Sequence, residues 1–316
     1  MNKYNRIKVS IIILNWNGEK LLQECLDSVY KNNLQNTEII LVDNASTDNS
    51  IGLVKQNFPE IKIIRNKKNY GYAKGNNIGI KNARGKYIVI LNNDVIVEED
   101  WLEKLVNAAD TNDSTGIFGS RQMFYHNRDK VDSIGGFLKK DGPHNINNST
   151  PWTNPDKNRE VFSVAGAAML LKRKMLQEVG LFDPMYFLYY EDFDLCWRAR
   201  LLGWKCYYVS SAVIYHHRGA STSRTGKHMF YGERNRWWTL IKNFSTKSLI
   251  KFLPYILYRQ ILVLLDSSFG NMIWTILGLL NGIKHIGEIL QKRKKIQNIR
   301  KIDDNKILKW IYQATN

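Results

Sequence analysis

A short apolar run over residues 87–91 lies between Gly85 and the polar triplet Asn92, Asn93 and Asp94. Its length and its strand-forming residues predict a buried strand that delivers Asp94 to a cleft. In an open α/β sheet, ligands bind beyond the carboxyl ends of the strands, so Asp94 stands where a metal or a phosphate would be held. An Asx turn that merely closes the strand is the alternative interpretation.

Two earlier apolar runs end in the same way. Residues 8–15 close on Asn15, and residues 38–43 close on Asp43. Because strands that alternate with helices form parallel sheets, this order predicts an α/β protein. The periodicity predicts the other elements of the alternation as a helix over residues 21–29, a helix carrying residues 51–54 and a strand over residues 61–64.

Glycine recurs at every fourth position in the next segment, at Gly71, Gly75 and Gly79. The spacing is not the G-x-G-x-x-G of a dinucleotide fold, and no G-x-x-x-x-G-K-[ST] phosphate loop occurs in the chain. The glycines predict a smooth helix face for close packing. Asn76, on the same segment, offers an amide to a ligand.

The alternating pattern ends near residue 116, where shorter strand-like pieces begin. Residues 139–160 are polar and contain Pro143, Pro151 and Pro155. We expect a long surface loop there, and loops of this length in compact domains tend to be lids or binding segments.

A second informative stretch, residues 180–204, leads through tyrosine and phenylalanine into a helix whose first turn carries Glu191, Asp192 and Asp194. Asp194 and Arg198 are spaced four residues apart, as in an ordinary ion pair within a helix. Glu191 and Asp192 are better placed for a cleft, where apolar surroundings tune a carboxylate for proton abstraction.

Charge and cysteine content narrow the class of protein. The net charge is +17, and residues 220–316 hold 17 Lys and Arg against 5 Asp and Glu, an excess of 12 that implies an anionic partner. Cys25, Cys196 and Cys206 are odd in number and lack metal-ligand spacing, which predicts packed, reduced thiols in a cytosolic protein. Residues 1–8 show no apolar signal region.

Six pieces of the chain resemble glycosyltransferase family 2 in order and spacing, especially its rhamnosyltransferase-like members. The resemblance spans roughly residues 8–240. The pieces are N-W-N-G at 15–18, V-D-N-A-S-T-D at 42–48, residues 69–79, L-N-N-D at 91–94, the block from F-D-P at 182–184 to E-D at 191–192, and Y-H-H at 215–217.

The resemblance implies a GT-A fold, a Rossmann-like domain for nucleotide-diphospho-sugar transferases, over residues 1–240. Residues 8–115 would form its nucleotide-binding half and residues 116–240 its acceptor half. The implied reaction is inverting transfer of a sugar from a nucleoside diphosphate donor, with Mn²⁺ or Mg²⁺ as the cation.

Carried over residue by residue, the resemblance assigns Asp192 as the base and Asp94 with His216 as metal ligands. Asn92 departs from the pattern, because it occupies the first acidic position of the family's D-x-D element, and this implies a low affinity for metal. The remaining assignments are a donor site of Asn15, Asp43, Asn76, Asn93 and Asp94 and an acceptor site of Glu191 and Trp197.

The last region, residues 241–316, is expected to be a basic helical appendage. Its longest uncharged run, 267–283, has 17 residues, fewer than the about 20 that span a bilayer. We expect amphipathic helices at the membrane interface, with the basic cluster 292–295 meeting anionic headgroups. A helical pair packed on the catalytic domain, or a homodimer, is the alternative.

The expected function is therefore sugar transfer, with rhamnose as a candidate, to a glycan or lipid-linked acceptor in cell-surface polysaccharide synthesis. The protein is expected to be cytoplasmic and peripheral at the inner face of the cell membrane. One rival is a catalytically silent nucleotide-sugar-binding protein. The other is a basic nucleic-acid-binding protein, but the chain has no zinc spacing or nucleic-acid motif, so no nucleic acid partner is expected.

Overall fold

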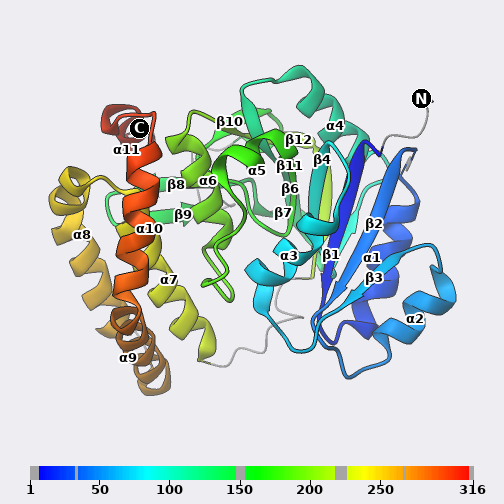
Figure 1. Ribbon diagram of the computed structural model, residues 1–316, viewed down its shortest axis with the longest axis horizontal. Coiled ribbons are helices and arrows are strands. Elements are labelled where there is room, and N and C mark those ends of the chain that lie inside the picture. Colours follow the sequence, from blue (N-terminus) through cyan, green and yellow to red (C-terminus); the bar gives the residue numbers. More distant parts are fainter. Residues whose placement is uncertain (1–6, 33–34, 147–153, 218–225, 266–267, 313–316) are drawn as a thin grey trace.

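The computed structural model describes residues 7–32, 35–146, 154–217, 226–265 and 268–312. Within these residues a ten-stranded mixed sheet has the order β10-β12-β6-β11-β4-β1-β2-β3, with β5 paired to β12 and β7 to β6 (Figure 1). Its strands are β1 Val9–Asn15, β2 Thr37–Asp43, β3 Lys62–Arg65, β4 Tyr87–Asn92, β5 Val95–Val97, β6 Thr115–Phe124, β7 Asn127–Ser133, β10 Arg159–Val161, β11 Ala168–Lys172 and β12 Lys205–His216.

The first half of the sheet is parallel, as the sequence predicts. β1 pairs in parallel with β2 and β4, and β2 pairs in parallel with β3. The register sets Asn15 opposite Asp43 and Leu14 opposite Asn92, so the polar residues at the strand ends meet at one edge. Beyond β4 the order changes, because β11 enters antiparallel between β4 and β6.

Helices cover both faces of the sheet. Alternate residues of a strand point to opposite faces, so Ile11 and Ile13 belong to one core and Ile12 to the other. The first core is covered by α1 Glu19–Tyr30, α2 Ser50–Asn57 and α4 Trp101–Thr111, and the second by α3 Gly71–Asn82, α5 Arg173–Val179 and α6 Glu191–Leu201.

Two of the regularly spaced glycines are packing residues, as predicted. A Cβ at Gly75 would lie 2.5 Å from Leu14 Cδ1, and one at Gly79 would lie 2.4 Å from Ile12 Cγ2. Helix α3 therefore lies directly on β1, where a larger residue would separate the two elements. The three cysteines are free and buried, which also agrees with the prediction.

The prediction of a long surface loop over residues 139–160 is partly wrong. A two-stranded hairpin of β8 Gly136–Lys139 and β9 Gly142–Asn145 enters it, and β10 adds its last residues to the main sheet. Backbone pairing to Gly135, Gly136 and β12 fixes these pieces, a long-range signal that local composition does not carry. Residues 147–153, including Pro151, lie outside the described residues.

The C-terminal helices pack against the part of the chain that contains α6 (Figure 1). Helix α7 runs through residue 240, so the expected domain boundary falls inside a helix. Phe252, Ile256 and Ile307 share one hydrophobic core with Phe193 and Trp197 of α6. The helices are α7 Lys227–Asn243, α8 Thr246–Leu265, α9 Phe269–Lys284, α10 Ile286–Ile299 and α11 Asp304–Tyr312.

The basic cluster 292–295 is only half available to an external partner. Lys292 forms an ion pair with Asp183, and Arg293 donates hydrogen bonds to the carbonyl oxygens of Ile241 and Phe244. The prediction that the whole cluster meets headgroups is therefore wrong for these two residues, whose charges serve internal contacts. Lys294 and Lys295 are exposed.

Among the described residues, one helix is long and apolar enough to cross a membrane by length and composition. This helix is α8, and 22% of its most apolar stretch of 18 residues is buried. It is a different segment from the long uncharged run over residues 267–283. That run falls largely on α9, which has 16 residues.

Candidate active site

The carboxyl ends of β1, β2 and β4 carry a buried polar network. The Asn15 side-chain amide donates to Ser50 Oγ at 2.9 Å and to Asp43 Oδ1 at 3.4 Å, and Asn15 Oδ1 accepts from Asn93 Nδ2 at 2.8 Å. Arg65 Nε lies 3.7 Å from Asp43 Oδ2. The structure thus brings together three of the predicted donor residues, Asn15, Asp43 and Asn93.

Asn76 stands apart from this network. It is fully buried on α3, where its amide donates to the carbonyl oxygen of Tyr72 at 3.1 Å. Its Oδ1 has no hydrogen-bond partner among the described residues. The contacts therefore do not join Asn76 to the other predicted donor residues.

A cleft of about 1110 Å³ opens beside the strand ends. Asp94 lines it on one side, and Glu191 and Asp192, at the first turn of α6, line it on another. His216, at the end of β12, also lines it. The cleft therefore joins the predicted metal ligands and the predicted base in one space, although they come from distant parts of the chain.

Strand pairing positions the two predicted metal ligands. β12 pairs with β5 so that His216 stands opposite Val95, and the His217 amide donates to the Asp94 carbonyl oxygen at 2.9 Å. His216 Nε2 consequently lies 3.6 Å from Asp94 Oδ1. Because a ligand oxygen lies about 2.1 Å from Mg²⁺, two atoms at this separation can hold one such ion.

Asp132, on β7, lines the cleft beside this pair, and the sequence reasoning missed it. Its Oδ2 lies 2.9 Å from Nδ1 of His216, so it fixes the ring with Nε2 toward Asp94. Burial alone would lower the pKa of His216, but the hydrogen bonds to Asp132 and Asp94 outweigh burial and raise that pKa to about 9. Asp132 lies in the polar stretch N-R-D-K-V-D-S, which carries no local sign of this role.

Asp192 is partly buried and held by two backbone amides. Its Oδ2 accepts from the Gly166 amide at 2.8 Å, and its Oδ1 accepts from the Phe193 amide at 2.7 Å. Burial raises the pKa of Asp192, and the two hydrogen bonds oppose that rise. The two amides favour the ionised form while burial makes the carboxylate more basic, a setting that suits a group that accepts a proton.

Glu191 is the more deeply buried neighbour, and it also lines the cleft. Burial raises its pKa well above the ordinary value, and the charge of Asp192 adds to the rise. Its Oε2 has no hydrogen-bond partner among the described residues. The two adjacent carboxyl groups thus lie in different environments, the kind of arrangement that separates an acid or hydrogen-bond donor from a base.

Trp197 does not line the cleft, so the prediction that it belongs to the acceptor site is wrong. It is fully buried, and its ring packs edge-on against Phe162 and Phe244. Helix α6 is buried on nearly all sides, so its aromatic residue turns into the core shared with the C-terminal helices. Asp194, by contrast, pairs with Arg198 at 2.8 Å as predicted, although the pair is buried rather than at the surface.

No group of three or more His, Cys, Asp or Glu among the described residues is arranged to hold a metal ion. Asp94 and His216 therefore offer a two-residue site. A carboxylate oxygen and an imidazole nitrogen fit a divalent cation that takes its other ligands from a bound substrate or from water.

Solved structures similar to this protein include complexes with nucleotides or nucleotide sugars. The protein is similar to GalNAc-T7 with UDP, GalNAc and Mn²⁺ (TM-score 0.70, 16% identity), covering 98% of this chain and 57% of that chain. It is also similar to Staphylococcus aureus TarS 1–349 in complex with UDP (TM-score 0.60, 14% identity), covering 97% and 90%. These likenesses confirm the predicted GT-A fold.

Sequence comparison supplies the family. The sequence model of glycosyl transferase family 2 matches residues 10–180. Glycosyltransferase GlyG of Streptococcus pneumoniae is 28% identical over 225 residues, 69% of this chain and 73% of that protein. N-acetylglucosaminyl-diphospho-decaprenol L-rhamnosyltransferase of Mycobacterium tuberculosis is 25% identical over 258 residues, 70% and 83%. The chain belongs to glycosyltransferase family 2 and is a glycosyltransferase of the inverting type.

Proposed function

We propose that this protein moves a sugar from a nucleoside diphosphate donor to an acceptor hydroxyl, with Asp192 as the general base. The observation that carries the proposal is the single cleft shared by Asp192 and the Asp94 and His216 pair. Asn15, Asp43 and Asn93 support it, because their network lies at the strand ends beside Asp94, where an α/β sheet binds nucleotides.

In the proposed reaction, Asp192 takes the proton of the acceptor hydroxyl while the hydroxyl oxygen attacks the anomeric carbon. The bond from that carbon to the diphosphate oxygen breaks, and the nucleoside diphosphate leaves with inversion of the sugar. Glu191, beside Asp192 in the cleft, binds the acceptor. Asp94 and His216 would hold the cation, and a bound Mn²⁺ or Mg²⁺ would neutralise the charge on the departing diphosphate.

The finer assignments rest on relatives and neighbours. The mycobacterial relative is named for L-rhamnose transfer to a lipid-linked acceptor, which supports rhamnose as the sugar and a lipid diphosphate as the acceptor. GalNAc-T7 and the Pyrobaculum calidifontis mannosyltransferase were solved with Mn²⁺, which supports that cation. We place the protein at the cytoplasmic face of a membrane, in the synthesis of cell-surface polysaccharide.

The test is a panel of nucleotide sugars with Mn²⁺ or Mg²⁺, read as thermal stabilisation and as release of nucleoside diphosphate. A ligand at about 100 times its dissociation constant adds about 2.7 kcal/mol to the free energy of unfolding. Asp94→Asn should lose the metal-dependent stabilisation. Asp192→Asn should keep it while turnover falls by about 10²–10⁴-fold.

Asp27→Asn is the matched control, since it neutralises an exposed carboxylate on α1 and should change neither measurement. Undiminished stabilisation of Asp94→Asn by donor and metal would remove Asp94 from the site. Turnover of Asp192→Asn within about tenfold of the wild-type value would place the base elsewhere.

A further inference from the structure

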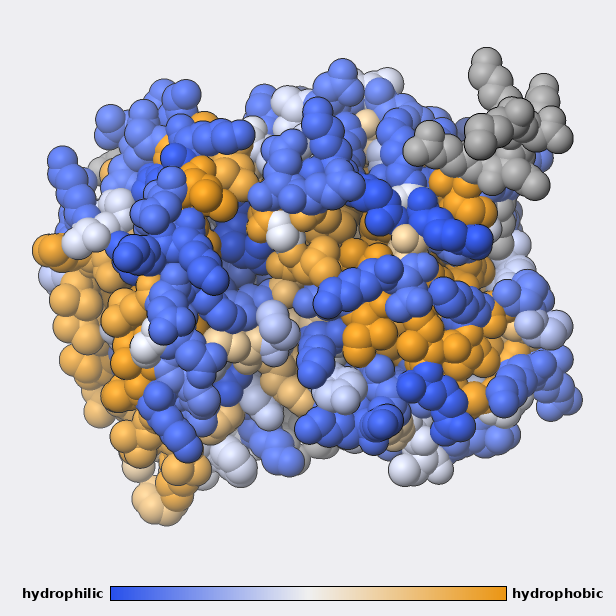
Figure 2. All heavy atoms as spheres, viewed as in Figure 1, coloured by the Kyte–Doolittle hydropathy of each residue, from blue (hydrophilic) through white to orange (hydrophobic). Residues whose placement is uncertain are grey.

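The exposed apolar surface of this protein is concentrated on its C-terminal helices. In the described part of the chain, 18 large hydrophobic side chains are exposed, and 17 of them lie between residues 250 and 299; the other is Trp16. Leu265 is 78% exposed, Phe269 74% and Ile250 68%. Apolar atoms cover the edge of the molecule formed by α8 and α9 (Figure 2). Contiguous apolar surface of this kind marks an interaction site.

Each of these two helices uses only a narrow stripe for internal packing. Helix α8 buries Ser248, Phe252, Ile256 and Gln260, which recur at every fourth position, and leaves the other faces open. Of the residues in helix α9, only Thr275 and Gly278 are buried. The exposed side chains that face outward are Ile250, Leu253, Tyr255, Leu257, Tyr258, Ile261, Leu262 and Leu265 on α8 and Phe269, Ile273, Ile276, Leu277, Leu280 and Ile283 on α9.

The charged side chains of α8 and α9 are all of one sign. Helices α8 and α9 together contain Lys247, Lys251, Arg259 and Lys284 but no Asp or Glu. The three lysines are exposed. We propose that the α8–α9 surface docks onto an anionic lipid bilayer, with its apolar side chains at the acyl boundary and its lysines among the headgroups.

A second copy of the chain fits this surface less well. A symmetric dimer would place the same patch against itself, and each copy would bring exposed lysines without any acidic residue of α8 or α9 to meet them. An anionic bilayer instead supplies the opposite charge. The one-signed charge of the patch therefore favours lipid over a partner copy.

Internal contacts keep α8 from spanning the bilayer, although its length and composition permit it. Arg259 binds both carboxylate oxygens of Glu233 on α7, at 3.0 and 3.2 Å. Gln260 Oε1 accepts from Arg236 at 2.9 Å and from Trp237 at 2.7 Å. Because crossing would expose these polar groups to hydrocarbon, α8 lies along the interface.

The surface lies one helix away from the catalytic cleft. Gly232 and His228 of α7 line the cleft. Phe230, between them in sequence, packs against α9, where a Cβ at Gly278 would lie 2.4 Å from the Phe230 carbonyl oxygen. A membrane bound to α8 and α9 thus brings a lipid-linked acceptor close to the cleft, an inference that rests on the proposed function.

Vesicle flotation of the full chain tests the docking surface without any donor or acceptor. Wild-type protein should float with phosphatidylcholine–phosphatidylglycerol vesicles and release at high salt. Ile250→Glu combined with Ile283→Glu should weaken the partition coefficient by more than about tenfold. Trp16→Ser, which removes the exposed aromatic side chain outside the patch, should float like the wild type.

A second pair of variants tests the charge. Lys247→Gln with Lys251→Gln should weaken partitioning by about 30-fold before salt screening. Lys55→Gln with Lys81→Gln, exposed lysines on α2 and α3, should have little effect. Donor-induced thermal stabilisation, measured in parallel, should be unchanged in the α8 variants. If the donor does not stabilise the wild type, the proposed function is overturned and the docking proposal is left intact.

Three results would overturn the docking proposal itself. Equal flotation of wild type with phosphatidylcholine vesicles would remove the role of charge. Release only by detergent would mean insertion across the bilayer. A dimer that Ile250→Glu and Ile283→Glu dissociate, with no flotation of the wild type, would assign the surface to a second copy.

Discussion

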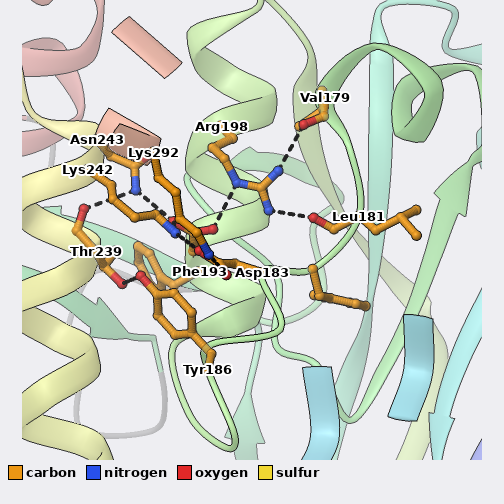
Figure 3. A network of polar contacts seen from close by, with 12 residues as sticks. Val179, Leu181, Asp183, Tyr186, Phe193, Arg198, Thr239, Lys242, Asn243 and Lys292 are labelled. Carbon is orange, nitrogen blue, oxygen red and sulfur yellow. Dashed lines mark hydrogen bonds and ion pairs between the residues drawn. The ribbon is translucent and has the colours of Figure 1, made fainter. Parts of the chain in front are cut away.

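Replacing Lys242 by methionine should destabilise the protein through a buried ion cluster that joins α7 and α10 to α6 (Figure 3). Lys242 Nζ lies 2.7 Å from Asp183 Oδ2 and 2.9 Å from Asp194 Oδ1, and the Lys242 side chain is 1% exposed. Methionine keeps the volume of the side chain but removes the ammonium group. Asp183 then keeps Lys292 and the Met185 backbone amide as partners, and Asp194 keeps Arg198 and the Asn243 side-chain amide.

The magnitude follows from the burial of the cluster. Removing one partner of a buried ion pair costs about 3–5 kcal/mol, because the remaining charge is left without compensation. An unfolding entropy of about 2.1 cal/mol/K per residue gives about 0.66 kcal/mol/K for 316 residues. Lys242→Met should therefore lower the melting temperature by about 5–8 °C at neutral pH.

The loss should shrink in acid. Burial alone would raise the pKa of Asp183, but the ammonium groups of Lys242 and Lys292 outweigh burial and hold that pKa well below its usual range. A carboxyl group whose pKa is lowered in the folded state contributes its full stabilisation at pH values above its unfolded pKa of about 3.9. That stabilisation is lost as the pH falls through the folded pKa. The difference between the variant and the wild type should therefore begin to shrink below about pH 4 and disappear only as the pH approaches the much lower folded value.

Scanning calorimetry at several pH values makes the comparison, and Lys104→Met is the control. Lys104 pairs with Asp100 at 2.7 Å on the surface of α4, so its loss should cost at most about 1 kcal/mol. If Lys242→Met and Lys104→Met shift the melting temperature equally, or if the shift is the same at every pH, the reasoning from buried charge is refuted.

Three further predictions concern the cleft. Asp132→Asn should weaken Mn²⁺ affinity by about 10–100-fold, measured by titration of the free protein, because His216 loses its orienting carboxylate. Glu191→Gln should raise the melting temperature at about pH 8 and leave it unchanged at about pH 4. Burial raises the pKa of Glu191, so its protonated side chain stabilises the folded protein below the unfolded pKa, and this stabilisation is lost as the pH rises. An equal shift at both pH values would contradict this reasoning. Asn235→Ala should lower kcat while donor binding, read by thermal shift, stays unchanged; parallel losses in both would mean a purely structural role.

Local pattern was enough to predict the parallel half of the sheet and the polar ends of its strands. Buried apolar runs that close on Asn15, Asp43 and Asp94 are properties of consecutive residues, and the parallel register then places those ends together. Asp132 could not be found this way, because its partner, His216, is 84 residues away and meets it only through the pairing of β6 with β7 and β12.

The C-terminal helices were the harder part for the same reason. Their periodicity shows that one face is apolar but not what covers it. Trp197 fills the core that these helices complete, and Lys292 finds Asp183 across 109 residues. A tryptophan beside a cleft motif and a run of basic residues have the same local sequence whether they face a ligand, a membrane or the protein interior.

Helix α7 also supports the turn that carries Asp192, the proposed base, to the cleft. Tyr189 and Tyr190 both adopt left-handed backbone conformations, with φ of 72° and 70°, which cost about 1–3 kcal/mol each for such residues. The buried side-chain amide of Asn235 donates to the carbonyl oxygens of Leu188 and Tyr189, both at 2.8 Å, and so offsets part of that strain. The turn ends at the first residue of α6 and sets its carboxyl groups against the cleft. Helix α7 therefore supports the segment that holds Asp192, and we predict that removing the residues beyond 226 disturbs the proposed base.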